Sequence, residues 1–178
     1  MFDVIIIGGG PAGYGAAEHA ARHGMTVALV ERARLGGTCL HRGCVPTKAY
    51  LHAAETAHEA VAYAPDALAR FDRLAMYARK NSIVDTLTQG IAQLMKAGKV
   101  AVYEGHGTLT SAESPFNVTV QKPDGTEETL SGAHVLLATG SAPARLPVPG
   151  CDDSAAWTSD DLLSEAGAVP FESLLIVG

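Results

Sequence analysis

The amino-acid sequence predicts an α/β protein: a Rossmann-like, doubly wound parallel sheet with a helical insertion and a small antiparallel β-meander. Three observations predict this fold. Residues 2–7 are a short apolar run that ends in glycine, as in a strand buried on both faces. The glycines at 8, 10 and 13 then fit the pattern G-x-G-x-x-G. A helical segment and a second apolar run at 26–30 complete a β-α-β unit.

The other elements follow in order along the chain. Apolar residues at helical spacing predict helices at 11–24, at 48–63 and, as a long amphipathic helix, at 70–96. Period-two alternation and turn residues predict a strand at 100–103, the antiparallel β-meander at 106–131 around a turn at 123–125, and a buried strand at 134–138.

The domain organisation follows from these elements. We predict a nucleotide-binding domain at 1–145, with its helical segment at 48–97, and a proline-containing linker at 146–172. Residues 173–178 read SLLIVG and repeat the DVIIIG of residues 3–8. We therefore expect them to be the first strand of a truncated NAD-binding domain; one more sheet strand before a natural C-terminus is the alternative.

Composition narrows the class of partner. The 178 residues are 47% hydrophobic and 18% charged, which suits a globular protein with a sizeable core. A net charge of -6 without a long Lys/Arg run argues against binding to nucleic acid or to an anionic membrane. The apolar runs are too short for a membrane span, and no export signal is evident. We expect a soluble, cytoplasmic protein whose partner is a small molecule or another protein.

The glycine pattern predicts a pyrophosphate site. Gly8 permits a tight turn, Gly10 allows a close backbone approach, and Gly13 lets the helix lie on the strand. A bound anion would meet the N-terminus of a helix that starts with Pro11. Glu31 lies 18 positions after Gly13, near the spacing at which a carboxylate binds ribose hydroxyls. The pattern alone does not choose between NAD and FAD.

Two of the three cysteines lie in residues 35–48, LGGTCLHRGCVPTK, which we call the cysteine segment. A paired dithiol in a reducing compartment is more often catalytic than structural. A helix starting near Cys44, with Lys48 one turn later, would favour a thiolate. Two inert core cysteines are the alternative. We predict no metal site, because C-x4-C lacks the usual zinc spacing and a second ligand pair.

The sequences GGGPAG, GGTCLHRGCVPTK and ATGS, together with Glu31, resemble the flavin-dependent pyridine nucleotide-disulfide oxidoreductases. The resemblance covers essentially the whole chain, as the N-terminal FAD domain of that family. It implies that Cys39 exchanges with the substrate disulfide, that Cys44 contacts the flavin, and that Lys48 lies by the reactive flavin nitrogen. The implied FAD-binding residues are Gly8, Gly10, Pro11, Ala12, Gly13, Glu31, Arg32, Gly37, Thr38, Cys39, Cys44, Lys48, Gly107, Ala138, Thr139, Gly140 and Ser141.

The cysteine segment is most similar to the branch of the family that oxidises dihydrolipoyl groups. That branch implies a lipoyl-bearing protein or small disulfide as partner, NAD bound by a missing domain, a homodimer in the complete enzyme, and no activity of this piece alone. Thr47 favours lipoyl over glutathione-type substrates. Three alternatives remain open: a reductase of mercuric ion, another disulfide reductase of the family, or a non-catalytic FAD-binding module. His41-Arg42 replaces the commoner Asn-Val, and the stretch between Glu31 and Gly36 is slightly short.

Overall fold

The structure is a computed structural model that describes residues 1–151, 156–168, 171 and 173–177. The chain divides into two compact units, each assembled from two segments. The first unit contains residues 1–40 and 85–141, and the second contains residues 41–84 and 142–178. The predicted linker and the predicted strand at 173–178 lie partly outside the described residues, at 152–155, 169–170, 172 and 178.

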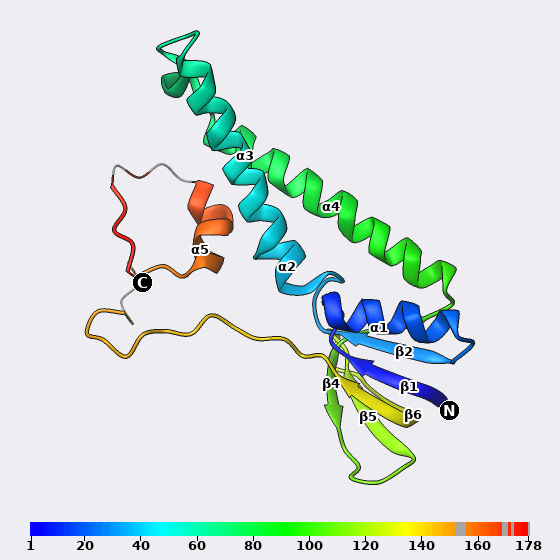
Figure 1. The fold of residues 1–178 in the computed structure, drawn as a ribbon. Helices are drawn as coiled ribbons and strands as arrows, with labels where there is room; N and C mark the ends of the chain where they lie inside the picture. Colours follow the sequence, from blue (N-terminus) through cyan, green and yellow to red (C-terminus); the bar gives the residue numbers. More distant parts are fainter. Residues whose placement is uncertain (152–155, 169–170, 172, 178) are drawn as a thin grey trace. The chain divides into compact units, whose positions relative to one another are not determined.

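The elements alternate as the sequence predicts in its first half (Figure 1). The strands are β1 (Phe2–Ile7), β2 (Val27–Glu31), β3 (Ala101–Glu104), β4 (His106–Leu109), β5 (Phe116–Gln121) and β6 (Glu127–Leu137). The α-helices are α1 (Pro11–Arg22), α2 (Gly37–His41), α3 (Cys44–Val61), α4 (Arg73–Ala97) and α5 (Ser159–Leu163). Two 3-10 turns, η1 (Ala67–Arg70) and η2 (Glu165–Ala168), complete the described elements.

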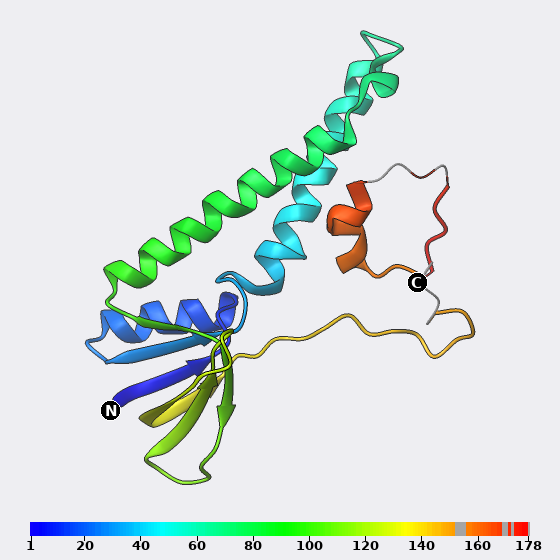
Figure 2. The same cartoon turned by 180° about the vertical axis from the view of Figure 1, so that it is seen from behind.

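The first unit is built on one six-stranded sheet with the order β3-β2-β1-β6-β5-β4. Strands β1, β2, β3 and the second half of β6 pair in parallel, whereas β4, β5 and the first half of β6 pair in antiparallel. The Rossmann-like α/β fold with a helical insertion and a β-meander is therefore confirmed (Figure 2).

Strand β6 corrects one prediction. The sequence suggested a meander strand ending near residue 131 and a separate strand at 134–138, but both belong to one strand, Glu127–Leu137. At Gly132 this strand pairs with Phe116 of β5 on one side and with Phe2 of β1 on the other. Because no proline or turn interrupts residues 131–133, the backbone stays extended and the meander continues the parallel sheet.

Two apolar clusters cover the two faces of this sheet. On one face Ala17 of α1 and Met95 of α4 pack with Ile6 and Leu29. On the other face, Val118 and Val120 of the meander pack with Ile5 and Val30. Because successive side chains of β1 and β2 point to opposite faces of the sheet, they pack against helices on one side and against the meander on the other.

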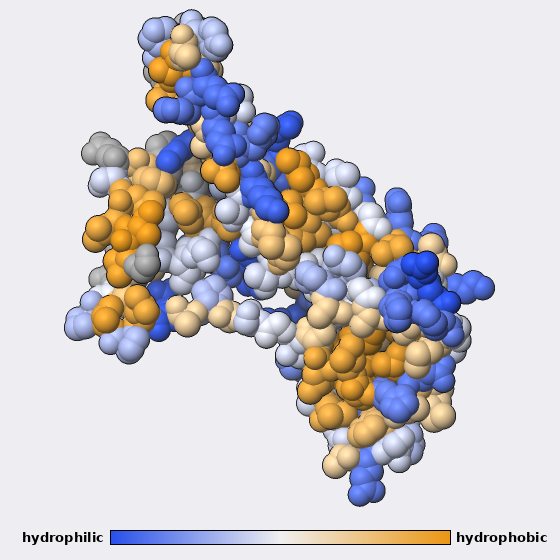
Figure 3. All heavy atoms as spheres, in the orientation of Figure 1, coloured by the Kyte–Doolittle hydropathy of each residue, from blue (hydrophilic) through white to orange (hydrophobic). Residues whose placement is uncertain are grey.

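The second unit contains the helical segment. Helix α3 begins at Cys44, four positions before the residue at which apolar periodicity places its start. Residues 173–177 form no strand in the structure, and Leu175 and Ile176 are 88% and 78% exposed. Figure 3 shows apolar residues gathered over the strands of the first unit and, separately, over the C-terminal segment. Over the described part of the chain, no helix has both the length and the apolar character that a bilayer crossing needs.

Candidate functional site

The turn from β1 into α1 requires glycine for steric reasons that the structure makes explicit. Gly8 has φ +108°, and its N–H donates to the Val30 carbonyl at 2.8 Å. A Cβ atom on Gly13 would lie 1.7 Å from the Gly8 carbonyl oxygen. The first turn of α1 therefore lies directly on the end of β1, which leaves its free N–H groups at the carboxyl edge of the sheet.

The cysteine segment begins against this turn. Gly37, at φ +60°, starts α2, and a Cβ atom on it would lie 2.6 Å from Cα of Gly10. The N–H of Gly36 donates to the Gly9 carbonyl at 2.8 Å. The glycine turn at residues 8–13 and the glycine pair at 36–37 thus pack backbone to backbone. We call Gly8, Gly10, Gly13 and Gly37 the glycine cradle.

Glu31 ends β2 beside the glycine cradle. Its Oε2 accepts a hydrogen bond from the Gly9 N–H at 2.7 Å, and its Oε1 accepts one from the Ala33 N–H at 2.8 Å. These bonds fix the carboxylate at the carboxyl edge of the sheet. Each oxygen keeps a further lone pair for a hydroxyl donor, which is what a ribose-binding role needs.

The end of β6 forms a third side of the cradle. The Ala138 N–H donates to the Ile7 carbonyl at 2.8 Å. A Cβ atom on Gly8 would lie 2.2 Å from the Ala138 carbonyl oxygen and 3.2 Å from Cα of Thr139. The strand-ending segment predicted to line the cofactor therefore lies beside the first glycine, and Gly140 follows at φ +73°.

The structure distributes the predicted site residues between the two units. The glycine cradle, Glu31 and the Ala138–Thr139 end of β6 come together in the first unit. Gly107 lies on β4, where a Cβ atom would meet the side chains of Val30 and Ile7 at 3.0 and 3.1 Å. The remaining first-unit residues of the prediction are Pro11, Ala12, Arg32, Thr38, Cys39, Gly140 and Ser141, and those of the second unit are Cys44 and Lys48.

Cys39 and Cys44 lie on consecutive helices. Cys39 is half-buried in the short helix α2, and Cys44 is exposed at the first position of α3. The Thr47 N–H donates to the Gly43 carbonyl at 3.1 Å, so α3 starts at Cys44 and the helix start predicted near this thiol is confirmed. Lys48 is exposed one turn later.

Several residues with defined roles were missed by sequence analysis. One is Gly9, whose carbonyl accepts the hydrogen bond from the Gly36 N–H that joins the two glycine turns; its place inside a glycine run was the available signal. In the second unit, Arg42 Nη1 lies 3.0 Å from Asp160 Oδ2, and Lys80 Nζ donates to the Leu163 carbonyl at 2.9 Å. These partners are 118 and 83 positions apart, and no local pattern indicates such pairs.

A separate open hollow of about 1130 Å³ lies in the second unit. Extended segments around Arg145 and Leu174, with Trp157 and Phe171, line it. None of its lining residues belongs to the predicted site. The chemistry of the glycine cradle, and not the size of this hollow, identifies the candidate site.

The fold and the glycine cradle define a dinucleotide-binding α/β domain that is followed directly by a cysteine pair. The family model for pyridine nucleotide-disulphide oxidoreductases matches residues 2–178. The chain belongs to this family.

Known relatives agree with this assignment. The chain is 39% identical to dihydrolipoyl dehydrogenase of Bacillus subtilis (strain 168) over 99% of its own length and 39% of the relative's. It is also 39% identical to dihydrolipoyl dehydrogenase of Chlorobaculum parvum, over 100% of this chain and 38% of that one. The chain therefore spans well under half the length of these relatives.

Two solved structures share this fold with the chain. The flavoprotein disulfide reductase RclA from Escherichia coli, solved as a Cu(II) complex, superposes with a TM-score of 0.76 at 25% identity, covering 93% of this chain and 34% of that one. LpdA from Mycobacterium tuberculosis gives a TM-score of 0.72 at 28% identity, covering 81% and 33%.

Proposed function

We propose that this chain binds FAD and forms the redox part of a dihydrolipoyl dehydrogenase, which converts dihydrolipoyl groups and NAD+ to lipoyl groups and NADH. The backbone packing of Gly37 on Gly10 is the observation on which the proposal rests. It joins the start of the cysteine segment to a pyrophosphate-type turn, as a flavin-linked disulfide requires. The names of the relatives, which match 99–100% of the chain, support the choice of substrate.

The residues present fit FAD. Ala12 and Gly13 have N–H groups in the first turn of α1, where no helical carbonyl precedes them, and these groups would bind the pyrophosphate. Glu31 would accept the hydroxyls of the adenosine ribose, since its two backbone bonds leave lone pairs on both oxygens. Thr38 and the segment from Ala138 to Ser141 would lie along the rest of the cofactor. FAD, when bound, supplies a two-electron acceptor for the dithiol.

The two cysteines would pass electrons by thiol-disulfide exchange. A dihydrolipoyl thiolate attacks the Cys39 sulfur of the Cys39–Cys44 disulfide, and Cys44 leaves as a thiolate. The second substrate thiolate then attacks the lipoyl sulfur bonded to Cys39, which closes the lipoyl disulfide and releases the Cys39 thiolate. The two dihydrolipoyl thiols first lose their protons to solvent, and their thiolates then give two electrons to the protein disulfide, which becomes two thiolates. Lys48, one helical turn after Cys44, places a positive charge near this thiolate.

The remaining parts of the enzyme are also proposals. We place the NAD site and the homodimer contacts in the length of the relatives that this chain does not span. The chain alone would then bind FAD without turning over lipoyl substrate. The exposed apolar residues 174–177, which repeat the β1 pattern, would begin the NAD-binding domain. Arg32 is exposed directly after β2, and Gly107 packs on Val30 and Ile7.

The test compares FAD binding by the wild-type chain and by Gly37→Ala. Alanine at φ +60° costs about 1–2 kcal/mol, and its Cβ would clash with the Gly10 backbone. We expect Gly37→Ala to weaken FAD binding at least tenfold in equilibrium dialysis. Gly15→Ala is the matched control, because a Cβ there meets nothing within 4 Å. Circular dichroism of each variant checks that it is folded.

A thiol titration completes this test. Oxidation of the folded wild-type chain should remove two of its three titratable thiols, and peptide mapping should find Cys39 joined to Cys44. A folded wild-type chain that binds no FAD, or that keeps three thiols under oxidising conditions, would rule out the proposed function.

A further inference from the structure

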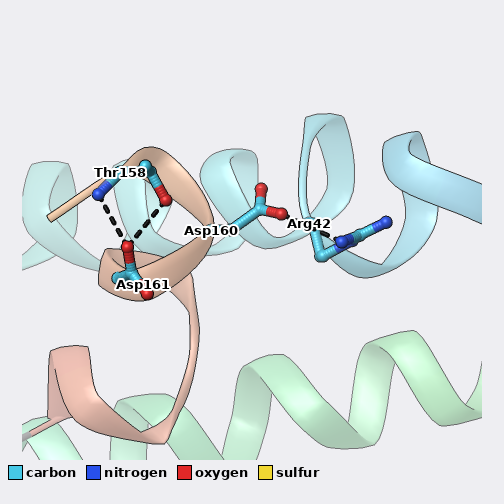
Figure 4. Close-up of polar contacts among 4 residues, drawn as sticks. All are labelled: Arg42, Thr158, Asp160 and Asp161. Atoms are coloured by element: carbon cyan, nitrogen blue, oxygen red, sulfur yellow. Dashed lines mark hydrogen bonds and ion pairs between the residues drawn. The ribbon is translucent and has the colours of Figure 1, made fainter. Parts of the chain in front are cut away.

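We propose that Asp160 is a positioning residue for the redox thiol Cys44, acting through Arg42 from the short helix α5. This inference rests on the proposed function, because it concerns the same cysteine pair. Arg42 lies between the two cysteines in sequence, and its Nη1 is 3.0 Å from Oδ2 of Asp160 (Figure 4). Both residues belong to the second unit, as does Cys44.

Helix α5 presents Asp160 in a defined orientation because its first turn is capped. The backbone N–H and the hydroxyl of Thr158 both donate to Oδ2 of Asp161, each at 2.7 Å (Figure 4). These two bonds lower the pKa of Asp161, the backbone bond contributing most, so the cap is charged at neutral pH. The neighbouring carboxylate of Asp160, only 22% exposed, is left to bind Arg42.

The other end of α5 is bound to α4. The Leu163 carbonyl is the last of the helix and lacks a partner within it, and it accepts a hydrogen bond from Lys80 Nζ at 2.9 Å. Lys80 is 4% exposed, and its ammonium lies 4.1 Å from the centroid of the Tyr77 ring. A buried ammonium gives this contact up only at a high cost. Helix α5 is therefore bound to α4 at its end and to the cysteine segment at its start.

The position of Arg42 limits the position of Cys44. Two residues span at most about 7 Å of extended chain, and only Gly43 separates Arg42 from the helix that starts at Cys44. Gly43, at φ -140° and ψ -112°, is the joint of this stretch, because glycine restricts the backbone less than any other residue. Without the Asp160 contact, that joint would let the start of α3 and the Cys44 sulfur sample more positions. Disulfide formation depends on the geometry of both sulfurs and would become less favourable.

The experiment measures the dithiol–disulfide equilibrium of the full chain against dithiothreitol. In this exchange oxidised dithiothreitol takes two electrons and two protons from the cysteine pair, which becomes a disulfide. We expect Asp160→Asn to lower the equilibrium constant for disulfide formation at least threefold. Arg42→Lys keeps a cation and should stay within twofold of wild type, whereas Arg42→Ala should match Asp160→Asn. Glu165→Gln, an equal charge change at an exposed position just after α5, is the control.

A second readout separates this inference from the proposed function. The rate at which iodoacetamide alkylates Cys44, resolved by peptide mass spectrometry, needs neither FAD nor a disulfide. We expect Asp160→Asn and Arg42→Ala to change this rate at least threefold, with urea unfolding showing that the variants are folded. If wild type forms no Cys39–Cys44 disulfide, the proposed function fails, and the alkylation rates alone decide the inference. Rates for Asp160→Asn within twofold of Glu165→Gln would overturn it.

Discussion

Lys80 places an ammonium group inside the second unit, where its Nζ donates to the Leu163 carbonyl and lies over the Tyr77 ring. Because burial disfavours the charged form, it lowers the pKa of Lys80. The hydroxyl of Tyr50, whose ring centroid is 5.9 Å from this Nζ, is buried, and no residue in the described ranges forms a hydrogen bond with it. Burial, and secondarily Tyr77, raise the pKa of Tyr50. These residues make the stability of the second unit depend on pH.

The sign of this dependence can be tested with Lys80→Met. A lysine in the unfolded chain titrates at about 10.5, and folded Lys80 titrates lower. Between these pKa values the unfolded chain binds more protons, so the free energy of unfolding rises with pH there and is flat below. Tyr50 acts in the opposite direction, but only above pH 10, because its folded pKa is raised. Wild type should therefore gain stability relative to Lys80→Met as pH rises towards 10.

Urea unfolding at pH 7, 8, 9 and 10 measures this difference. Lys96→Met, at an exposed position of the same helix, is the control and should give a difference that does not change with pH. If the free energies of unfolding of wild type and Lys80→Met differ by the same amount at all four pH values, Lys80 is not the source of the pH-dependent stability.

At the scale of elements, β6 decides how the meander and the parallel sheet join. At Gly132 the strand has β1 on one side and β5 on the other. Gly132 is buried, and a Cβ atom there would lie 2.9 and 3.0 Å from Cγ1 and Cδ1 of Ile5. The absence of a side chain lets Ile5 fill the core at this junction, so the glycine acts in packing and not as a break in the strand.

We expect Gly132→Ala to lower the free energy of unfolding by about 1–3 kcal/mol, because it overpacks the core. Gly90→Ala is the matched substitution in α4, where a Cβ meets nothing within 4 Å. It should raise the free energy of unfolding by up to about 1 kcal/mol, since alanine is the better helix former. Urea unfolding of both variants measures the opposite signs. Equal effects of the two substitutions would be inconsistent with the packing role of Gly132.

Apolar periodicity and glycine spacing predicted the helices, strands and turns that form over a few residues. They did not predict contacts between segments that are distant in the sequence. The β1-α1-β2 unit and the glycine turn were predictable because apolar periodicity and glycine spacing act over a few residues. The continuous strand β6 was not predictable. It pairs with β5 along its first part and with β1 along its second part, and no local pattern indicates these partner strands. The pairing of Gly37 with Gly10, like that of Arg42 with Asp160, joins segments whose separation no periodicity encodes. Gly107 was predicted to bind cofactor, and a Cβ atom there would lie 3.0 Å from Cγ1 of Val30, so the space beside this glycine is tight.

At the scale of the whole molecule, the division between the two units falls inside the cysteine segment. Leu40 ends the first segment of one unit, and His41 begins the other. Cys39 is therefore part of the unit that contains the glycine cradle, whereas Cys44 is part of the unit that contains α5. Oxidation of this pair would add a covalent bond within the cysteine segment. The redox state of the protein should therefore change its stability as well as its chemistry.

A Cys39–Cys44 disulfide closes a loop of about six residues, for which the chain-entropy relation gives a stabilisation of about 2 kcal/mol. We expect the oxidised chain, in a Cys151→Ser background that prevents mispairing, to unfold at a higher urea concentration than the reduced chain. Trp157, the sole tryptophan, reports on the second unit by fluorescence, while circular dichroism reports on both units. With Cys44→Ser added, oxidant should leave both transitions unchanged. Peptide mapping must first show that the Cys39–Cys44 disulfide has formed. If neither urea midpoint then rises, the bond does not restrain the unfolded chain as proposed, and its role is confined to electron transfer.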